Sequence, residues 1–142
     1  MKKIALLLCA IVLLTALSAC EYKRDYNFLH DPSKIERIEL VMIGEEDFED
    51  EIGQSTVCTI EDTDAFIADF SALDCYLIYT DPTAVEAGKT VIKIVYTGGE
   101  YELIGVGGQS RYTTEKQYNH YAGYRYFKTE DFQALLSKYL GE

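Results

Sequence analysis

Few side chains in this sequence have the type and spacing that catalysis requires. The chain holds two histidines, His30 and His120, and Ser110 is the serine expected in a polar loop before the second of them. Nucleophilic catalysis needs a base within hydrogen-bond reach of an activated hydroxyl, and no local spacing ties Ser110 to His120. We therefore expect no catalytic residues. The alternative is a hydrolase that gathers His120, Ser110 or an acidic pair in a cleft.

Motifs for cofactors and metals are also incomplete. Gly88-Lys89-Thr90 ends like a phosphate-binding loop, but we expect a strand rather than a helix after it. The run at 45–51 contains six carboxylates, the ligand type that Ca²⁺ prefers, without the alternating Asp order that surrounds one ion. We expect no cofactor and no metal, and we interpret 45–51 as a solvated loop in which Ca²⁺ binding stays an open question.

Tyrosine and arginine gather near the C-terminal third of the chain. Seven of the twelve tyrosines fall between Tyr96 and Tyr126. Tyrosine and arginine are enriched at binding hot spots, although tyrosine also suits a half-buried strand and Tyr124 and Tyr126 need no other explanation. The sequence predicts a binding patch made of Arg111, Tyr112, Tyr118, His120, Tyr121 and Arg125.

The first twenty residues have the layout of an export signal. Lys2 and Lys3 precede an uncharged segment at 4–17, and small residues lead to Cys20. The uncharged segment is shorter than the roughly 20 residues that a membrane-spanning helix needs. A cleaved signal is therefore favoured over a membrane span.

The end of this segment, Leu17-Ser18-Ala19-Cys20, resembles the bacterial lipobox, Leu-[Ala/Ser]-[Gly/Ala]-Cys. The resemblance implies that a signal peptidase reads Leu17, Ser18 and Ala19, and that Cys20 becomes an N-terminus carrying a diacylglyceryl group. Two acyl chains hold a protein on a membrane where one chain would exchange. The expected location is the cell membrane, facing outside the cytoplasm. The alternative is an ordinary signal peptide that ends in cysteine.

Length and charge indicate how the chain is divided into domains and which partners it can have. We divide it into a signal peptide at 1–19, a lipid anchor and tether at 20–34, and one globular domain at 35–142. Loss of Lys2 and Lys3 with the signal takes the formal charge from −11 to −13. So acidic a surface repels nucleic acid and anionic lipid headgroups. We expect no nucleic-acid partner, and we expect the domain to stand off the membrane.

Two cysteines, Cys58 and Cys75, lie in the domain. A pair in an exported protein favours a disulfide. Two buried thiols in strands, acting as small apolar side chains, are the alternative. The sequence leaves both possibilities open.

Hydrophobic periodicity predicts six strands and two helices in the order ββαββββα. The first helix is expected to be capped by Asp62 or Thr63, and the second by Thr129. Because helices do not alternate with strands, we expect a single α+β domain, an antiparallel sheet of about six strands with both helices on one face. The predicted strands are 35–43, 54–60, 75–80, 89–97, 100–106 and 121–128, the helices are 62–73 and 129–141, and 107–119 is a polar loop.

The strands at 89–97 and 100–106 form the clearest local unit. Gly98-Gly99 predicts a two-residue hairpin turn. That turn places Tyr96 opposite Tyr101 on an apolar face, and Glu102 on the other face opposite Val95.

The lipobox, Val91-Ile92-Lys93-Ile94-x-Tyr96 and Tyr126-Phe127-x-x-Glu130-x-Phe132-x-x-Leu135 together look like small bacterial lipoproteins of the Gram-positive, Clostridia-like kind. The likeness carries no activity and no functional residues. Our hypothesis is a surface lipoprotein that acts as a binding or interaction module at the cell envelope. Its partner would be an envelope protein, a glycan or a small molecule. The alternatives are an envelope hydrolase and a structural component without a ligand.

Overall fold

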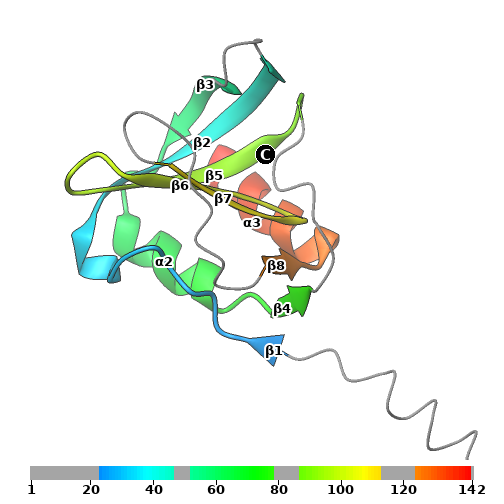
Figure 1. The fold of residues 1–142 in the computed structure, drawn as a ribbon. Coiled ribbons are helices and arrows are strands. Elements are labelled where there is room, and N and C mark those ends of the chain that lie inside the picture. The colour runs from blue at the N-terminus through cyan, green and yellow to red at the C-terminus, as the bar shows by residue number, and fades with distance from the viewer. Residues whose placement is uncertain (1–22, 47–51, 79–86, 113–123, 142) are drawn as a thin grey trace, which may run out of the picture.

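The computed structural model describes residues 23–46, 52–78, 87–112 and 124–141. Within these ranges the chain alternates short loops with the elements labelled in Figure 1. The strands are β1 (Lys23–Arg24), β2 (Ile35–Glu46), β3 (Ile52–Thr59), β4 (Cys75–Ile78), β5 (Thr90–Tyr96), β6 (Tyr101–Gly105), β7 (Gly108–Tyr112) and β8 (Tyr124–Phe127). The helices are the 3₁₀ turn η1 (Pro32–Lys34), α2 (Thr63–Ser71) and α3 (Thr129–Leu140).

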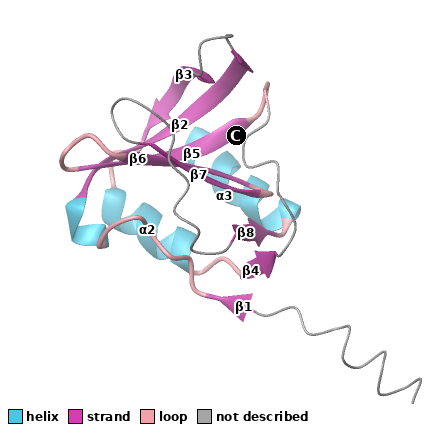
Figure 2. Cartoon of the chain, in the orientation of Figure 1, coloured by secondary structure: helices cyan, strands magenta, loops and turns pink. Residues whose placement is uncertain are grey.

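The strands form two antiparallel sheets. The larger has the order β3-β2-β5-β6-β7 and the smaller has the order β1-β4-β8. Figure 2 shows α2 and α3 below the larger sheet, with the smaller sheet at the end of the helices. The predicted α+β class with antiparallel strands is confirmed. The strands are divided between two sheets rather than joined in one, and β7 lies where the sequence predicts a polar loop.

The main core lies between the larger sheet and the two helices. Alternation along β2 turns Ile38 and Leu40 toward the helices and Val41 and Ile43 toward the opposite face. The helices contribute three phenylalanines that are almost fully buried, Phe66, Phe70 and Phe132. The opposite face buries a smaller cluster of Val41, Ile43, Val91 and Leu103.

Capping follows the sequence at one helix and departs from it at the other. The side chain of Asp62 accepts a hydrogen bond from the Ala65 amide at 2.9 Å, which confirms the predicted cap of α2. The N-cap of α3 is Lys128 rather than Thr129, and its side chain makes no capping hydrogen bond. Gly141 ends α3 with φ of 75°, a conformation that glycine adopts without strain.

The predicted hairpin register is wrong by one residue. The Gly99 amide donates to the Tyr96 carbonyl and the Tyr96 amide donates to the Glu100 carbonyl, so the loop contains three residues, 97–99. Ile94 therefore pairs with Glu102, and Val95 pairs with Tyr101. A shift of one residue exchanges the faces of a strand. Glu102 consequently lies on the core face, not on the opposite one.

Candidate functional site

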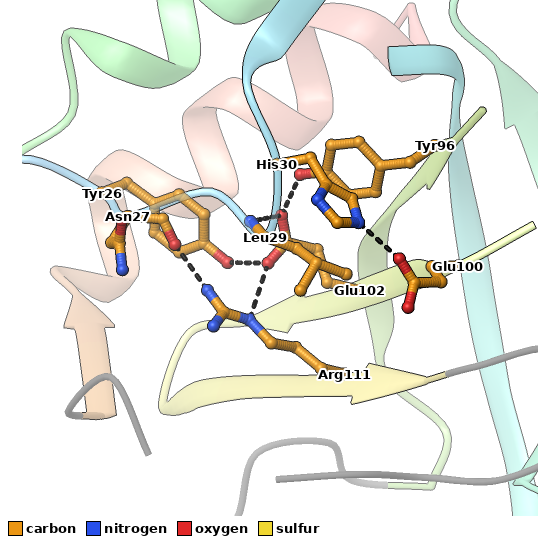
Figure 3. Close-up of polar contacts among 8 residues, drawn as sticks. All are labelled: Tyr26, Asn27, Leu29, His30, Tyr96, Glu100, Glu102 and Arg111. Atoms are coloured by element: carbon orange, nitrogen blue, oxygen red, sulfur yellow. Dashed lines mark hydrogen bonds and ion pairs between the residues drawn. The ribbon is translucent and has the colours of Figure 1, made fainter. Parts of the chain in front are cut away.

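Glu102 is the centre of a buried polar cluster that joins the N-terminal segment to the larger sheet. Its side chain is 0% exposed in β6. The Tyr26 hydroxyl donates to its Oε2 at 2.9 Å, and the Leu29 amide donates to its Oε1 at 3.2 Å. The Tyr96 hydroxyl also donates to Oε1. Figure 3 shows these donors converging on one carboxylate.

Arg111 supplies the positive charge that balances Glu102. β7 pairs with β6 so that these two residues are direct cross-strand neighbours. Arg111 is 5% exposed, and its Nε lies 3.5 Å from Glu102 Oε2. Its terminal nitrogen donates to the Asn27 carbonyl at 2.6 Å. A buried charge is tolerated when it is paired and hydrogen-bonded. Glu102 meets both conditions, whereas Arg111 is paired and donates through its terminal nitrogen but its Nε makes no hydrogen bond.

Two tyrosines serve as permanent donors to the carboxylate. Burial, followed by the negative charge of Glu102, raises the pKa of Tyr26 well above its ordinary value. The same two causes raise the pKa of Tyr96. Because both phenols keep their protons at neutral pH, both donate to Glu102 under ordinary conditions.

His30 forms a second pair at the edge of this cluster. Its Nε2 contacts a carboxylate oxygen of Glu100, and both side chains are about one third exposed. The imidazole lies edge-on to Tyr96, with ring centroids 5.1 Å apart. His30 and Glu102 therefore both hold the same stretch of the N-terminal segment against β5 and β6.

The N-terminal segment is part of the folded domain. The sequence predicts a tether at 20–34 whose end docks on the domain. In the structure β1 pairs with β4, and Tyr26, Phe28 and Leu29 pack against the main core. The ring of Tyr26 meets that of Phe70 edge-on at 5.0 Å. From Lys23 onward the segment is thus fixed by strand pairing, by apolar contacts and by the Glu102 cluster.

The predicted binding patch is not assembled by the residues that the structure describes. Arg111 is buried against Glu102, so its assignment to an exposed patch is wrong. Tyr112 and Arg125 lie in β7 and β8, but their side chains are outside the described part. Tyr118, His120 and Tyr121 lie outside the described residues altogether.

Cys58 and Cys75 do not form a disulfide. Cys75 is buried in the main core, in the smaller sheet. Cys58 lies in β3 of the larger sheet, with its Sγ 3.6 Å from the Tyr139 carbonyl. Of the two possibilities that the sequence leaves open, the structure has two thiols.

The remaining predicted features fall mostly outside the described part. This holds for Leu17, Ser18, Ala19 and Cys20 and for residues 47–51 of the acidic run. Among the described residues, no group of His, Cys, Asp or Glu could hold a metal ion. None of the described helices is long and apolar enough to span a membrane. Ser110 lies in β7 rather than in a loop.

Two open hollows lie near the smaller sheet. One, of about 460 Å³, runs between α2 and α3, with Leu73 and Leu135 among its lining residues. The other, of about 330 Å³, lies beside β1 and is lined in part by Lys23, Arg24 and Asp74. Neither hollow is lined by residues of the Glu102 cluster, and the contacts of its carboxylate are made within the protein. We therefore interpret the cluster as a structural clamp.

Sequence reasoning missed the clamp because its members are far apart in the chain. Tyr26 and Glu102 are separated by 76 residues, and Asn27 and Arg111 by 84. One local signal was present, since Glu102 is an acidic residue inside the predicted strand 100–106, between Tyr101 and Leu103. Comparison with models of protein families, with curated proteins and with solved structures gives no match in any of the three.

Proposed function

We propose that this protein is a lipoprotein held on the cell membrane by a diacylglyceryl group on Cys20, and that its domain acts outside the cytoplasm as a binding or interaction module of the cell envelope. The observation that carries the proposal is the sequence Leu17-Ser18-Ala19-Cys20 after a basic and apolar segment.

The way the chain enters the domain supports this proposal. An anchored domain transmits any pull between membrane and partner through the residues that follow the lipid. Here those residues begin a strand at Lys23, and the Glu102 clamp fixes the segment further along. An N-terminal segment that is packed firmly on the domain suits a protein that is held on the membrane by its N-terminus.

Lipidation is tested by replacing the acceptor cysteine. We expect the wild type to enter the membrane fraction with the added mass of a diacylglyceryl group, and Cys20→Ala to lose both. Cys9→Ala is the matched control, because it removes a thiol upstream of the proposed cleavage site and leaves Cys20 intact. A wild-type protein whose mass shows no lipid would contradict the proposal.

Binding is tested with the lipidated protein as bait in detergent-solubilised envelope. Arg111 is unsuitable as a surface mutation because it is buried, so the residues to replace are Tyr118 and Tyr121. We expect a protein or glycan to be recovered with the wild type and to be lost with the double alanine variant. Equal recovery by both proteins would remove these tyrosines from the binding surface.

A further inference from the structure

The smaller sheet is held close to the proposed lipid anchor. β1 begins three residues after Cys20, and three extended residues span at most about 11 Å. β1 is also fixed to the domain, because Lys23 pairs with Tyr76 and Arg24 pairs with Cys75. The surface around β1 can therefore never be far from the lipid headgroups.

The charge of this region differs from that of the chain as a whole. The three strands and their flanks, 23–25, 74–78 and 124–128, contain four basic and two acidic residues. Inclusion of Glu130 and Asp131 from the first turn of α3 brings the balance to zero, in a chain of net charge −11. Glu21, which lies between Cys20 and β1, adds one negative charge, so the region nearest the anchor carries −1 and has little of the acidic excess that repels anionic headgroups.

Side chains typical of the membrane interface lie on this sheet. The register places Lys23, Tyr76 and Tyr126 side by side across the three strands. The rings of Tyr76 and Tyr126 stack at 5.2 Å, and Lys128 Nζ lies 6.0 Å from the centre of the Tyr76 ring. The Lys23 side chain is 62% exposed and pairs with Asp74 at 2.5 Å, whereas Arg24 and Lys128 are exposed. Tyr76 is buried beneath this surface, so Tyr126 is the tyrosine nearer to solvent. Tyrosine and lysine are favoured where apolar stems and polar tips meet headgroups.

The hollow beside β1 adds room for a headgroup. It has a volume of about 330 Å³, and Lys23, Arg24, Asp25 and Asp74 are among its lining residues. Because charged groups of both signs line it, the hollow suits a polar headgroup rather than an acyl chain.

We propose that the surface formed by β1, β4 and β8 rests on the headgroups of anionic phospholipids, with Arg24 and Lys128 contacting lipid phosphates. This inference depends on the proposed lipid anchor, and it replaces the expectation that the domain stands off the membrane. Figure 1 places β3 at the other end of the molecule from β1. The β3 edge, including the exposed Val57, then faces away from the membrane, where a partner can reach it.

Tryptophan reporters test this orientation, because the chain contains no tryptophan. The lipidated full-length protein is placed in vesicles of phosphatidylglycerol and phosphatidylcholine that carry a quencher at headgroup depth. We expect strong quenching of tryptophan in Tyr126→Trp and weak quenching in Tyr101→Trp, which reports on the opposite face of the larger sheet. Equal quenching at the two positions would overturn the inference.

Charge reversal tests whether the basic side chains contact the lipid headgroups or merely lie near them. The test variant combines Arg24→Glu with Lys128→Glu in the Tyr126→Trp background. Each basic charge removed should shift the equilibrium from the membrane-bound toward the released orientation by roughly fivefold, so that quenching of the tryptophan falls. Lys34→Glu combined with Lys89→Glu is the matched control, since it changes the net charge equally at exposed positions elsewhere. Loss of quenching with both pairs, or with neither, contradicts a specific contact.

The mass of the protein distinguishes the two proposals. If the Tyr126→Trp protein carries the lipid but its tryptophan is not quenched, this inference is overturned and the anchor stays intact. A protein without the lipid overturns the anchor and this inference together.

Discussion

Glu102 and Arg111 offer the sharpest test at the scale of single residues. Replacing one member of a buried ion pair leaves the other charged and unpaired, which typically costs about 3–5 kcal/mol. We expect Glu102→Ala and Arg111→Ala each to lower the free energy of unfolding by this amount, and the double variant to lose less than the sum. Urea unfolding of the four proteins measures the coupling.

A neighbouring carboxylate provides the control for this cycle. Glu100 lies two residues away and pairs with His30, but both side chains are partly exposed. Exposed pairs contribute about 0–1 kcal/mol, so Glu100→Ala should be mild. If the effects of Glu102→Ala and Arg111→Ala add without coupling, the two residues do not act as a pair.

The two tyrosines that donate to Glu102 contribute to how stability depends on alkaline pH. A tyrosine in the unfolded chain loses its proton near pH 10, whereas Tyr26 and Tyr96 retain theirs because their pKa values are raised in the folded state. Their contribution is complete below pH 10 and is lost as pH rises toward the folded-state pKa values. Each tyrosine should lower the free energy of unfolding by about 1.4 kcal/mol per pH unit in that range.

Thermal unfolding followed by circular dichroism between pH 8 and about pH 11 checks this dependence. Tyr26→Phe removes one of the two groups, so its stability should fall less steeply with pH than that of the wild type. The variant is also expected to be less stable at neutral pH, because Glu102 loses a donor. Identical slopes for the two proteins would show that Tyr26 does not couple folding to proton release.

At the scale of elements, the turn between β5 and β6 decides which face Glu102 occupies. Gly98 has φ of 108°, and a Cβ built on it would meet nothing within 4 Å. Any cost of Gly98→Ala is therefore a backbone cost, and we expect about 1–2 kcal/mol. Lys34→Ala is the control, since the exposed Lys34 side chain lies near the turn and its loss should be nearly neutral. A neutral Gly98→Ala would contradict this account.

The same turn shows which features of the fold can be predicted from the sequence alone. Local chemistry correctly identifies Asp62 as a cap of α2, since capping depends on residues close in the chain. The glycine pair predicts a hairpin, but it does not decide whether the loop holds two residues or three. That single residue moves Glu102 to the core face and so creates the clamp, whose contacts with the N-terminal segment join residues 73 to 84 positions apart.

The cysteines show a second feature that the sequence alone does not predict. Composition favours a disulfide in an exported chain, but bonding depends on where each strand lies. Cys58 and Cys75 belong to strands of different sheets, and the division into two sheets is not evident from a pattern of six strands. Arg111 is misassigned for a related reason, because the sequence predicts a loop in place of β7 and therefore offers no partner strand.

At the scale of the whole molecule, the N-terminal segment joins the proposed anchor to the folded domain. Tyr26, Phe28 and Leu29 pack on the core and are partly buried, and full burial of such a side chain contributes at most about 1.5–3 kcal/mol. Removing them also deprives buried Glu102 of two of its donors. The combined loss is comparable to the total stability of a typical domain, about 5–15 kcal/mol.

Two truncations of the mature chain test this dependence. A chain without residues 20–22 keeps β1 and the clamp, and it should unfold at the same temperature as the mature chain. A chain without residues 20–30 should show no cooperative thermal transition, because the core and Glu102 are both left incomplete. If the shorter chain instead unfolds cooperatively at an unchanged temperature, the segment is a tether after all, and the domain is not held at a fixed distance from its anchor.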